Sequence, residues 1–151
     1  MNYAHLHLLI NHFPIVGNAF SILLLVWSFV RKQREITQLA LGVTILVALT
    51  GYASDFTGGK AFDQVKDLPG ITVEALKAHA HAADLSLYFL YATGALALLA
   101  LFLYTTNRRS PATLFIYLTF ILALVSAYFL YRTGFLGGLI RHPEISSGMK
   151  N

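Results

Sequence analysis

Residues 11–30 read NHFPIVGNAFSILLLVWSFV, and residues 31–35, which follow directly, read RKQRE. A helix of about 20 mostly apolar residues is long enough to cross the roughly 30 Å hydrocarbon core of a bilayer. The charged cluster then ends the span, because charged side chains are costly inside hydrocarbon. This stretch therefore predicts a transmembrane helix that ends in a polar loop.

The rest of the chain has the composition of a membrane protein. Of its 151 residues, 56% are hydrophobic and 12% are charged, and the mean hydropathy is +0.62. Soluble domains are usually about 45–50% apolar and about 25% charged. Three more stretches are apolar and long enough to be spans, at about residues 36–54, 81–104 (starting at His79 or His81) and 111–131, with a loop predicted at 55–78. Spans of this length favour helices over barrel strands.

Loop lengths and glycine positions predict the topology. The connections after the first and third spans are short, which makes consecutive helices antiparallel neighbours. We therefore predict an all-α fold, an integral membrane antiparallel four-helix bundle that forms one domain over residues 1–151, with both termini on the extracytoplasmic side. The polar segment 60–77 is expected to form a short surface helix and a turn. The glycine pairs at 58–59 and 137–138 are expected to end helices.

The few charges are distributed unequally between the two ends of the bundle. The loops after the first and third spans carry five basic residues and one acidic residue, a net charge of +4, whereas the other end carries six of each. By the positive-inside rule the basic loops face the cytoplasm, which predicts a multi-pass protein of the bacterial inner membrane whose other end faces the periplasm or exterior. The sequence pI of about 9.5 then reflects orientation in the lipid bilayer. No nucleic-acid partner is expected, because the aromatic residues lie inside the spans.

Six histidines fall at the predicted outer end. They are His5, His7, His12, His79, His81 and His142. The chain has no cysteine, which excludes disulfides, thiolate metal sites, iron–sulfur clusters and covalent c-type haem. Imidazole suits a membrane interface, and it is also the usual protein ligand of haem iron, copper and zinc. Haem b bound by two axial histidines suits an apolar bundle, whereas copper or zinc would require three or four converging ligands.

The first span offers two candidate ligands, His7 and His12. Pro14 lacks an N–H and would clash with the carbonyl one turn earlier, so the regular helix is expected to begin near residue 11. His12 then lies in the first turn and His7 in a separate N-terminal segment. The sequence therefore favours His12 over His7 as a ligand.

The third span offers His79 and His81, which are about 200° apart on a helix, so at most one of them points into the core. The face of His79 consists of small and apolar residues that would let a flat macrocycle or a helix approach: Ala83, Ser86, Leu90, Thr93 and Ala97. The face of His81 includes Asp84 and Tyr88, which are candidates to orient a ligating imidazole. Asp84 could also transfer protons or pair with Arg132, and Tyr88 also fits an aromatic belt. Spacing alone does not choose between the two histidines.

An internal repeat is discernible. Thr57-Gly58-Gly59 follows the second span, Thr133-Gly134 and Gly137-Gly138 follow the fourth, and histidines precede the first and the third. A duplicated two-helix hairpin would produce this pattern, as would chance similarity between Gly- and Leu-rich helices.

Three motifs carry a resemblance to a known family. They are His7-x4-His12-Phe13-Pro14-Ile15, then Thr57-Gly58 with Leu68-Pro69-Gly70 and His79, and finally Thr133-Gly134-x2-Gly137-Gly138. Over roughly residues 5–142 the chain resembles the bacterial four-span membrane family catalogued as domain of unknown function 2231. Members look like haem-bearing or redox-associated membrane proteins, some joined to cytochrome c or iron–sulfur domains. The resemblance implies electron transfer at the outer membrane face through His7, His12 and either His79 or His81.

The chain departs from the family pattern in two places. Leu8 stands where the family has proline. After the double glycine the family has an extended hydrophobic tail that contains a further histidine, whereas this chain has the sequence LIRH at residues 139–142. The resemblance therefore assigns no role to His142.

Together these features predict a membrane-bound electron-transfer subunit that binds haem b near the outer face through His12 and either His79 or His81, with His7 as a further candidate. The expected partners are a quinone and an extracytoplasmic or membrane redox subunit. We expect an electron carrier or subunit rather than a self-contained enzyme, because no nucleophile, base and acid converge. Two alternatives stay open: a non-redox interaction subunit of a larger membrane complex, and a copper- or zinc-binding membrane protein.

Overall fold

The structure is a computed structural model that describes residues 2–142. Over that range every regular element is a helix: α1 (Tyr3–Ile10), α2 (His12–Arg31), α3 (Arg34–Val65), α4 (Val73–Thr105) and α5 (Arg109–Arg141). The predicted all-α class is confirmed. Counting α1 and α2 together, four helical segments are long and apolar enough to cross a membrane. These four segments have the length and composition of the spans of a multi-pass membrane protein.

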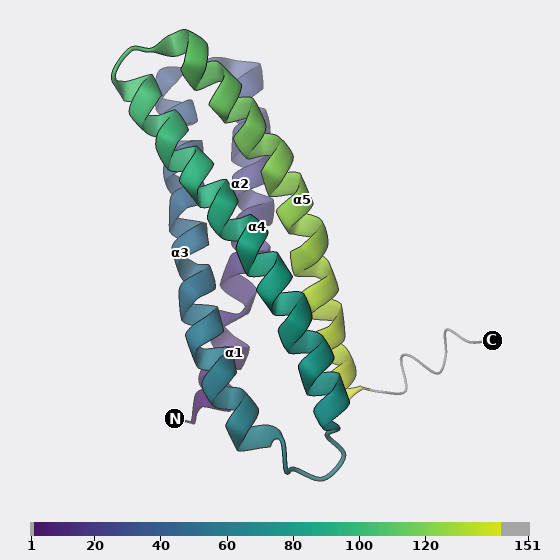
Figure 1. The fold of residues 1–151 in the computed structure, drawn as a ribbon. Coiled ribbons are helices and arrows are strands. Elements are labelled where there is room, and N and C mark those ends of the chain that lie inside the picture. The colour runs from purple at the N-terminus through teal and green to yellow at the C-terminus, as the bar shows by residue number, and fades with distance from the viewer. Residues whose placement is uncertain (1, 143–151) are drawn as a thin grey trace, which may run out of the picture.

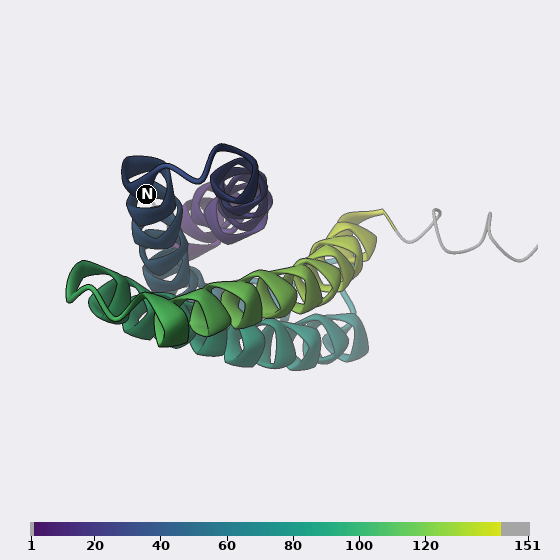
Figure 2. The same cartoon turned by 90° about the horizontal axis from the view of Figure 1, so that it is seen from above.

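The long helices lie side by side, and Figure 1 shows that each runs in the opposite direction to the one before it. α4 and α5 pack against each other along their lengths, and α3 lies between α4 and the α1–α2 segment. Seen from above in Figure 2, the α4–α5 hairpin is inclined relative to α2 and α3. Large apolar side chains point outward on every long helix, for example Phe20, Leu46, Leu98 and Leu124. Such a surface is suited to lipid rather than water.

Small residues bring the helices close together. A Cβ added to Gly94 of α4 would lie 2.5 Å from Cβ of Ala48 on α3, so the two backbones approach closely at that point. Close approach through glycine and alanine is the usual way in which helices pack within membranes, where lipid gives no hydrophobic drive for association. Larger residues fill the space on either side, with Leu25 and Leu41 towards the basic loops and Leu87 and Leu90 towards the histidines.

The helices extend beyond the predicted spans, which corrects the predicted loop at 55–78. α3 continues through Gly58 and Gly59 to Val65, and α4 begins at Val73, so only residues 66–72 connect them. The surface helix predicted for residues 60–77 is therefore wrong. Likewise α5 continues through Gly137 and Gly138 to Arg141. Glycine lowers helix stability by about 1 kcal/mol relative to alanine but does not by itself end a helix.

The N-terminal segment divides where Pro14 predicts. α1 ends at Ile10 and α2 begins at His12, which places Pro14 in the first turn of α2. Asn11 between them has helical backbone angles, φ −62° and ψ −19°. The break therefore removes hydrogen bonds without redirecting the chain, and residues on one face of α1 stay in line with one face of α2.

Candidate cofactor site

Two histidines from different halves of the bundle meet at its histidine-bearing end. The rings of His7 on α1 and His79 on α4 have centroids 6.4 Å apart and planes inclined at 74°. Both side chains are half-buried. His5, His12 and His81 are exposed. Of the predicted ligands, the structure thus brings together His7 and His79.

Each ring of the pair is fixed by a backbone carbonyl of the neighbouring helix. Nδ1 of His7 lies 3.0 Å from the carbonyl oxygen of Ser54 on α3, and Nδ1 of His79 lies 3.0 Å from that of Thr133 on α5. A carbonyl oxygen only accepts, so Nδ1 carries the proton in each ring. In the neutral imidazole Nε2 then has the free lone pair that a metal requires.

The two glycine pairs explain how the rings reach those carbonyls. Gly58 follows Ser54 by four residues, about one helical turn, and Gly137 follows Thr133 by the same interval. A Cβ on Gly58 would lie 3.0 Å from Cε1 of His7, and one on Gly137 would lie 3.1 Å from Cε1 of His79. Both contacts are tighter than ordinary van der Waals packing, so the rings occupy space that only glycine leaves open.

The arrangement therefore occurs twice, once in each hairpin. A histidine from the first helix donates to a carbonyl of the second, and a glycine one turn further along leaves room for its ring. This gives a structural basis for the sequence repeat. Ser54, Gly58 and Gly59 occupy the places of Thr133, Gly137 and Gly138.

Thr57 adds a second contact to the His7 ring. Its Oγ1 lies 3.3 Å from Nδ1 of His7 and donates to the carbonyl of Ala53 at 2.8 Å. Thr57 is buried, and its hydroxyl contacts the same ring nitrogen of His7 as the Ser54 carbonyl.

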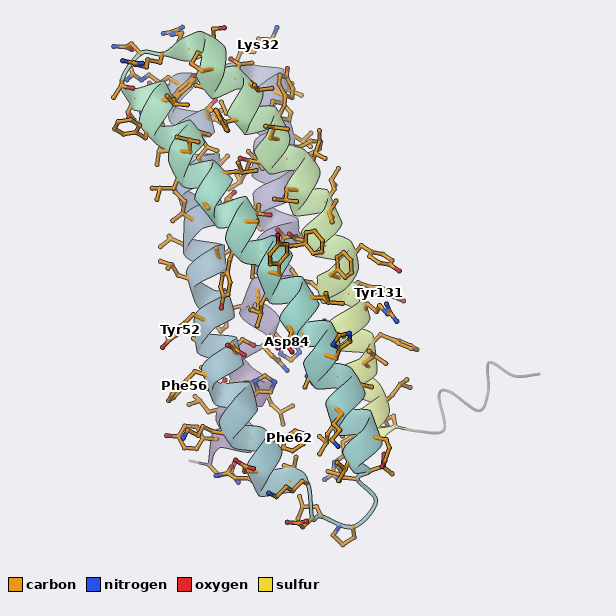
Figure 3. The ribbon with its side chains drawn as sticks, viewed as in Figure 1. Lys32, Tyr52, Phe56, Phe62, Asp84 and Tyr131 are labelled. Carbon is orange, nitrogen blue, oxygen red and sulfur yellow. The ribbon has the colours of Figure 1, made fainter. Side chains whose placement is uncertain are left out.

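The remaining candidates lie away from the ring pair. Nδ1 of His12 lies 2.9 Å from the carbonyl oxygen of Leu8, one turn earlier in the same segment. His81, Asp84 and Tyr88 lie on an exposed face of α4. Figure 3 shows Asp84 between the end marked by Lys32 and the end marked by Phe62. Asp84 forms no ion pair with Arg132. Among residues 2–142 the salt bridge found is between Lys66 and Asp63. His142 closes α5 as its C-cap and is exposed.

A line of buried polar side chains runs into the bundle from His7. Asn11, Asn18 and Ser21 lie on the same face of the α1–α2 segment, one or two turns apart. Nδ2 of Asn18 donates to the carbonyl of Ala123 on α5 at 3.0 Å. In contrast, Oδ1 of Asn11, Oδ1 of Asn18 and Oγ of Ser21 are buried without a hydrogen-bond partner in the described chain. Buried polar atoms of this kind normally have a partner, so they indicate capacity for a ligand or for water.

Ligand number and spacing limit which metal group the pair can hold. Among residues 2–142 no group of three His, Cys, Asp or Glu side chains is placed to bind a metal, so the pair would supply two ligands only. A metal bound by both Nε2 atoms lies about 2 Å from each, and each nitrogen lies about 1 Å from its ring centre, so opposed ligands have centroids about 6 Å apart. The observed 6.4 Å fits that value. Haem iron is bound mainly by its porphyrin, so two histidines would suffice to hold it, whereas copper or zinc would need further ligands.

No protein family model, no curated protein and no solved structure matches this chain.

Proposed function

We propose that this protein is a membrane-bound electron-transfer subunit that binds haem b through Nε2 of His7 and Nε2 of His79. The observation that carries the proposal is the ring pair. Two half-buried imidazoles lie with their ring centroids 6.4 Å apart, and each has its Nδ1 proton directed to a helix carbonyl. The pair lies between the α1–α3 half of the bundle and the α4–α5 half, where a flat group would contact both.

The chemistry of the bound group would be that of haem b, whose iron gains and loses one electron. The chain's own contribution is to prepare the ligands. The carbonyls of Ser54 and Thr133 hold both rings in the tautomer that leaves Nε2 available. A hydrogen bond from Nδ1 also makes the Nε2 lone pair more basic and therefore a stronger ligand for a metal. Asn11 would offer its unpartnered amide oxygen, or its NH2 group after a flip, to a polar edge of the ligand.

The charge distribution supports a location near the outer face of the inner membrane. Lys32 lies at the end of the bundle opposite to Phe62 and α1, as Figures 1 and 3 show. By the positive-inside rule the Lys32 end faces the cytoplasm, so the ring pair lies on the extracytoplasmic side. Electrons would then pass to or from an extracytoplasmic or membrane partner subunit, with a membrane quinone at the other end of the transfer.

The test is the optical spectrum of the purified full-length protein from haem-replete cells. The proposal predicts a Soret band, α and β bands that sharpen on reduction, and about one extractable haem b per chain. Colourless protein that co-purifies with larger membrane subunits would support the non-redox interaction subunit instead. About one copper or zinc per chain without porphyrin would support the copper- or zinc-binding alternative, and either result would overturn the proposal.

A further inference from the structure

A groove on the lipid-facing surface between α3 and α4 lies close to the ring pair. It encloses about 460 Å³, and its walls are mostly apolar, with Leu49 and Leu98 exposed along its length. Its floor is the close crossing of α3 and α4, where Ala48 meets Gly94. An apolar groove of this kind, open to the membrane, suits the hydrocarbon part of a lipid-soluble molecule.

Polar groups gather at one end of this groove. Asp55 and Tyr52 of α3 and Tyr91 of α4 line it there, and all three are exposed. Figure 3 shows Tyr52 projecting outward from α3. Within residues 2–142 none of the three side chains has a hydrogen bond or an ion pair. The Asp55 carboxylate at the edge of the membrane span therefore has oxygens that can accept hydrogen bonds from a ligand or from water.

The polar end is adjacent to the ring pair along the backbone. Asp55 directly follows Ser54, whose carbonyl oxygen accepts from His7. Gly51 lies on α3 one turn before Asp55, and the ring of Tyr91 packs over it. Cε1 of Tyr91 is 3.4 Å from the position that a Cβ on Gly51 would occupy. A molecule whose polar head occupied this end would therefore lie beside the helix turn that positions His7.

We propose that the groove binds a membrane quinol, with the Asp55 carboxylate accepting a hydrogen bond from one hydroxyl of the head group. This inference rests on the proposed electron-transfer function and names the class of its membrane substrate. Tyr52 and Tyr91 would flank the aromatic head, and the apolar groove would take the tail. The head is uncharged, and its hydroxyl would donate to a carboxylate that accepts no hydrogen bond from the described side chains. An anionic phospholipid would bring net negative charge towards the same carboxylate, which like-charge repulsion opposes.

The experiment measures equilibrium binding of radiolabelled decyl-benzoquinol to the purified full-length protein in phosphatidylcholine nanodiscs without oxygen. Asp55→Asn should weaken binding about tenfold, because it replaces a charge-assisted hydrogen bond with a neutral one. Ala95→Trp should abolish binding by filling the groove from its exposed side. Asp84→Asn is the matched control, an exposed carboxylate on α4 outside the groove, and should leave binding unchanged. Helical circular dichroism and the melting temperature of each variant show whether it is folded.

Unchanged quinol binding in both folded groove variants would overturn the proposal, as would equal losses in Asp55→Asn and Asp84→Asn. Phosphatidylethanolamine retained by the wild type and released by Asp55→Asn, with no quinol bound, would identify a lipid site instead and would also overturn it. The haem spectrum is recorded on the same samples. Haem without Asp55-dependent quinol binding contradicts only this inference, whereas Asp55-dependent quinol binding by a colourless protein contradicts only the proposed function.

Discussion

Replacing Gly58 with alanine would place a Cβ 3.0 Å from Cε1 of His7, 3.3 Å from its Nδ1 and 3.6 Å from its Nε2. The ring would have to move by a few tenths of an ångström, yet its Nδ1 is already held at 3.0 Å by the carbonyl of Ser54 and lies 3.3 Å from Oγ1 of Thr57. Movement would therefore lengthen the hydrogen bond that orients the ligand. Loss of such an orienting contact typically lowers metal affinity by about 10- to 100-fold.

Gly59 provides a matched control for this substitution. It neighbours Gly58 on the same helix, and an added Cβ there meets no atom within 4 Å. Gly59→Ala should stabilise α3 by about 0.5–1 kcal/mol through helix propensity alone, without changing haem affinity. Gly58→Ala raises helix propensity by the same amount but displaces the His7 ring. Its haem affinity should therefore fall about tenfold or more relative to that of Gly59→Ala.

The assay is titration of the haem-free protein with haem, followed by the Soret absorbance, alongside thermal unfolding of the same samples. The second hairpin repeats the comparison, because Gly137 contacts His79 whereas an added Cβ on Gly138 meets nothing within 4 Å. The reasoning is refuted if Gly58→Ala and Gly59→Ala bind haem equally well.

Further substitutions test the packing that holds the two halves together. Gly94→Val would force a side chain against Ala48, where a Cβ alone lies 2.5 Å away, and should destabilise the bundle by about 1–3 kcal/mol, seen as a lower melting temperature in detergent. Gly42→Ala, with no atom within 4 Å, should instead raise stability by about 0.5–1 kcal/mol, and a decrease would contradict the packing described. Asn18→Ala removes the hydrogen bond to Ala123 and should cost about 1 kcal/mol or less; a loss of several kcal/mol would show that Asn18 has further partners.

Hydropathy and helical periodicity predicted much of the fold. Apolar runs bounded by charge located the four segments, since a membrane requires long apolar helices. On the third span the small-residue face of His79 is the inward one, with Ser86, Leu90 and Thr93 buried, whereas Asp84 and Tyr88 on the face of His81 are exposed. Periodicity grouped these residues correctly, but which group faces inward depends on contacts with α3 and α5, which one helix does not determine.

Pro14 leads the sequence to favour His12 over His7 as a ligand, whereas the structure places His7, and not His12, beside His79. Its missing N–H separates α1 from α2, but Asn11 keeps helical angles, so His7 stays in line with the buried face of α2. His12 lies on an exposed part of the turn. The available signal was the polar face itself, because residues 7, 11, 14, 18 and 21 recur at helical spacing across the break.

The glycine pairs were interpreted as helix ends, and their role depends on tertiary contacts. Gly58 and Gly137 lie inside continuous helices and leave room for rings from α1 and α4. A glycine at a helix end and a glycine beneath a side chain look alike in a single sequence. The repeat distinguishes the two roles of glycine. In each hairpin a hydroxyl residue lies four positions before the double glycine, and the other helix of the hairpin carries a histidine.

The central claim of the proposed function is that His7 and His79 would together hold one haem b. The most direct measurement compares the reduced-minus-oxidised spectra of four purified variants, His7→Ala, His79→Ala, His12→Ala and His81→Ala, at equal protein concentration. We predict that the first two lose the low-spin α band, whereas the last two, whose side chains are exposed, retain the wild-type spectrum and about one haem per chain. A wild-type spectrum in His7→Ala or His79→Ala, or its loss in His12→Ala, would contradict the account.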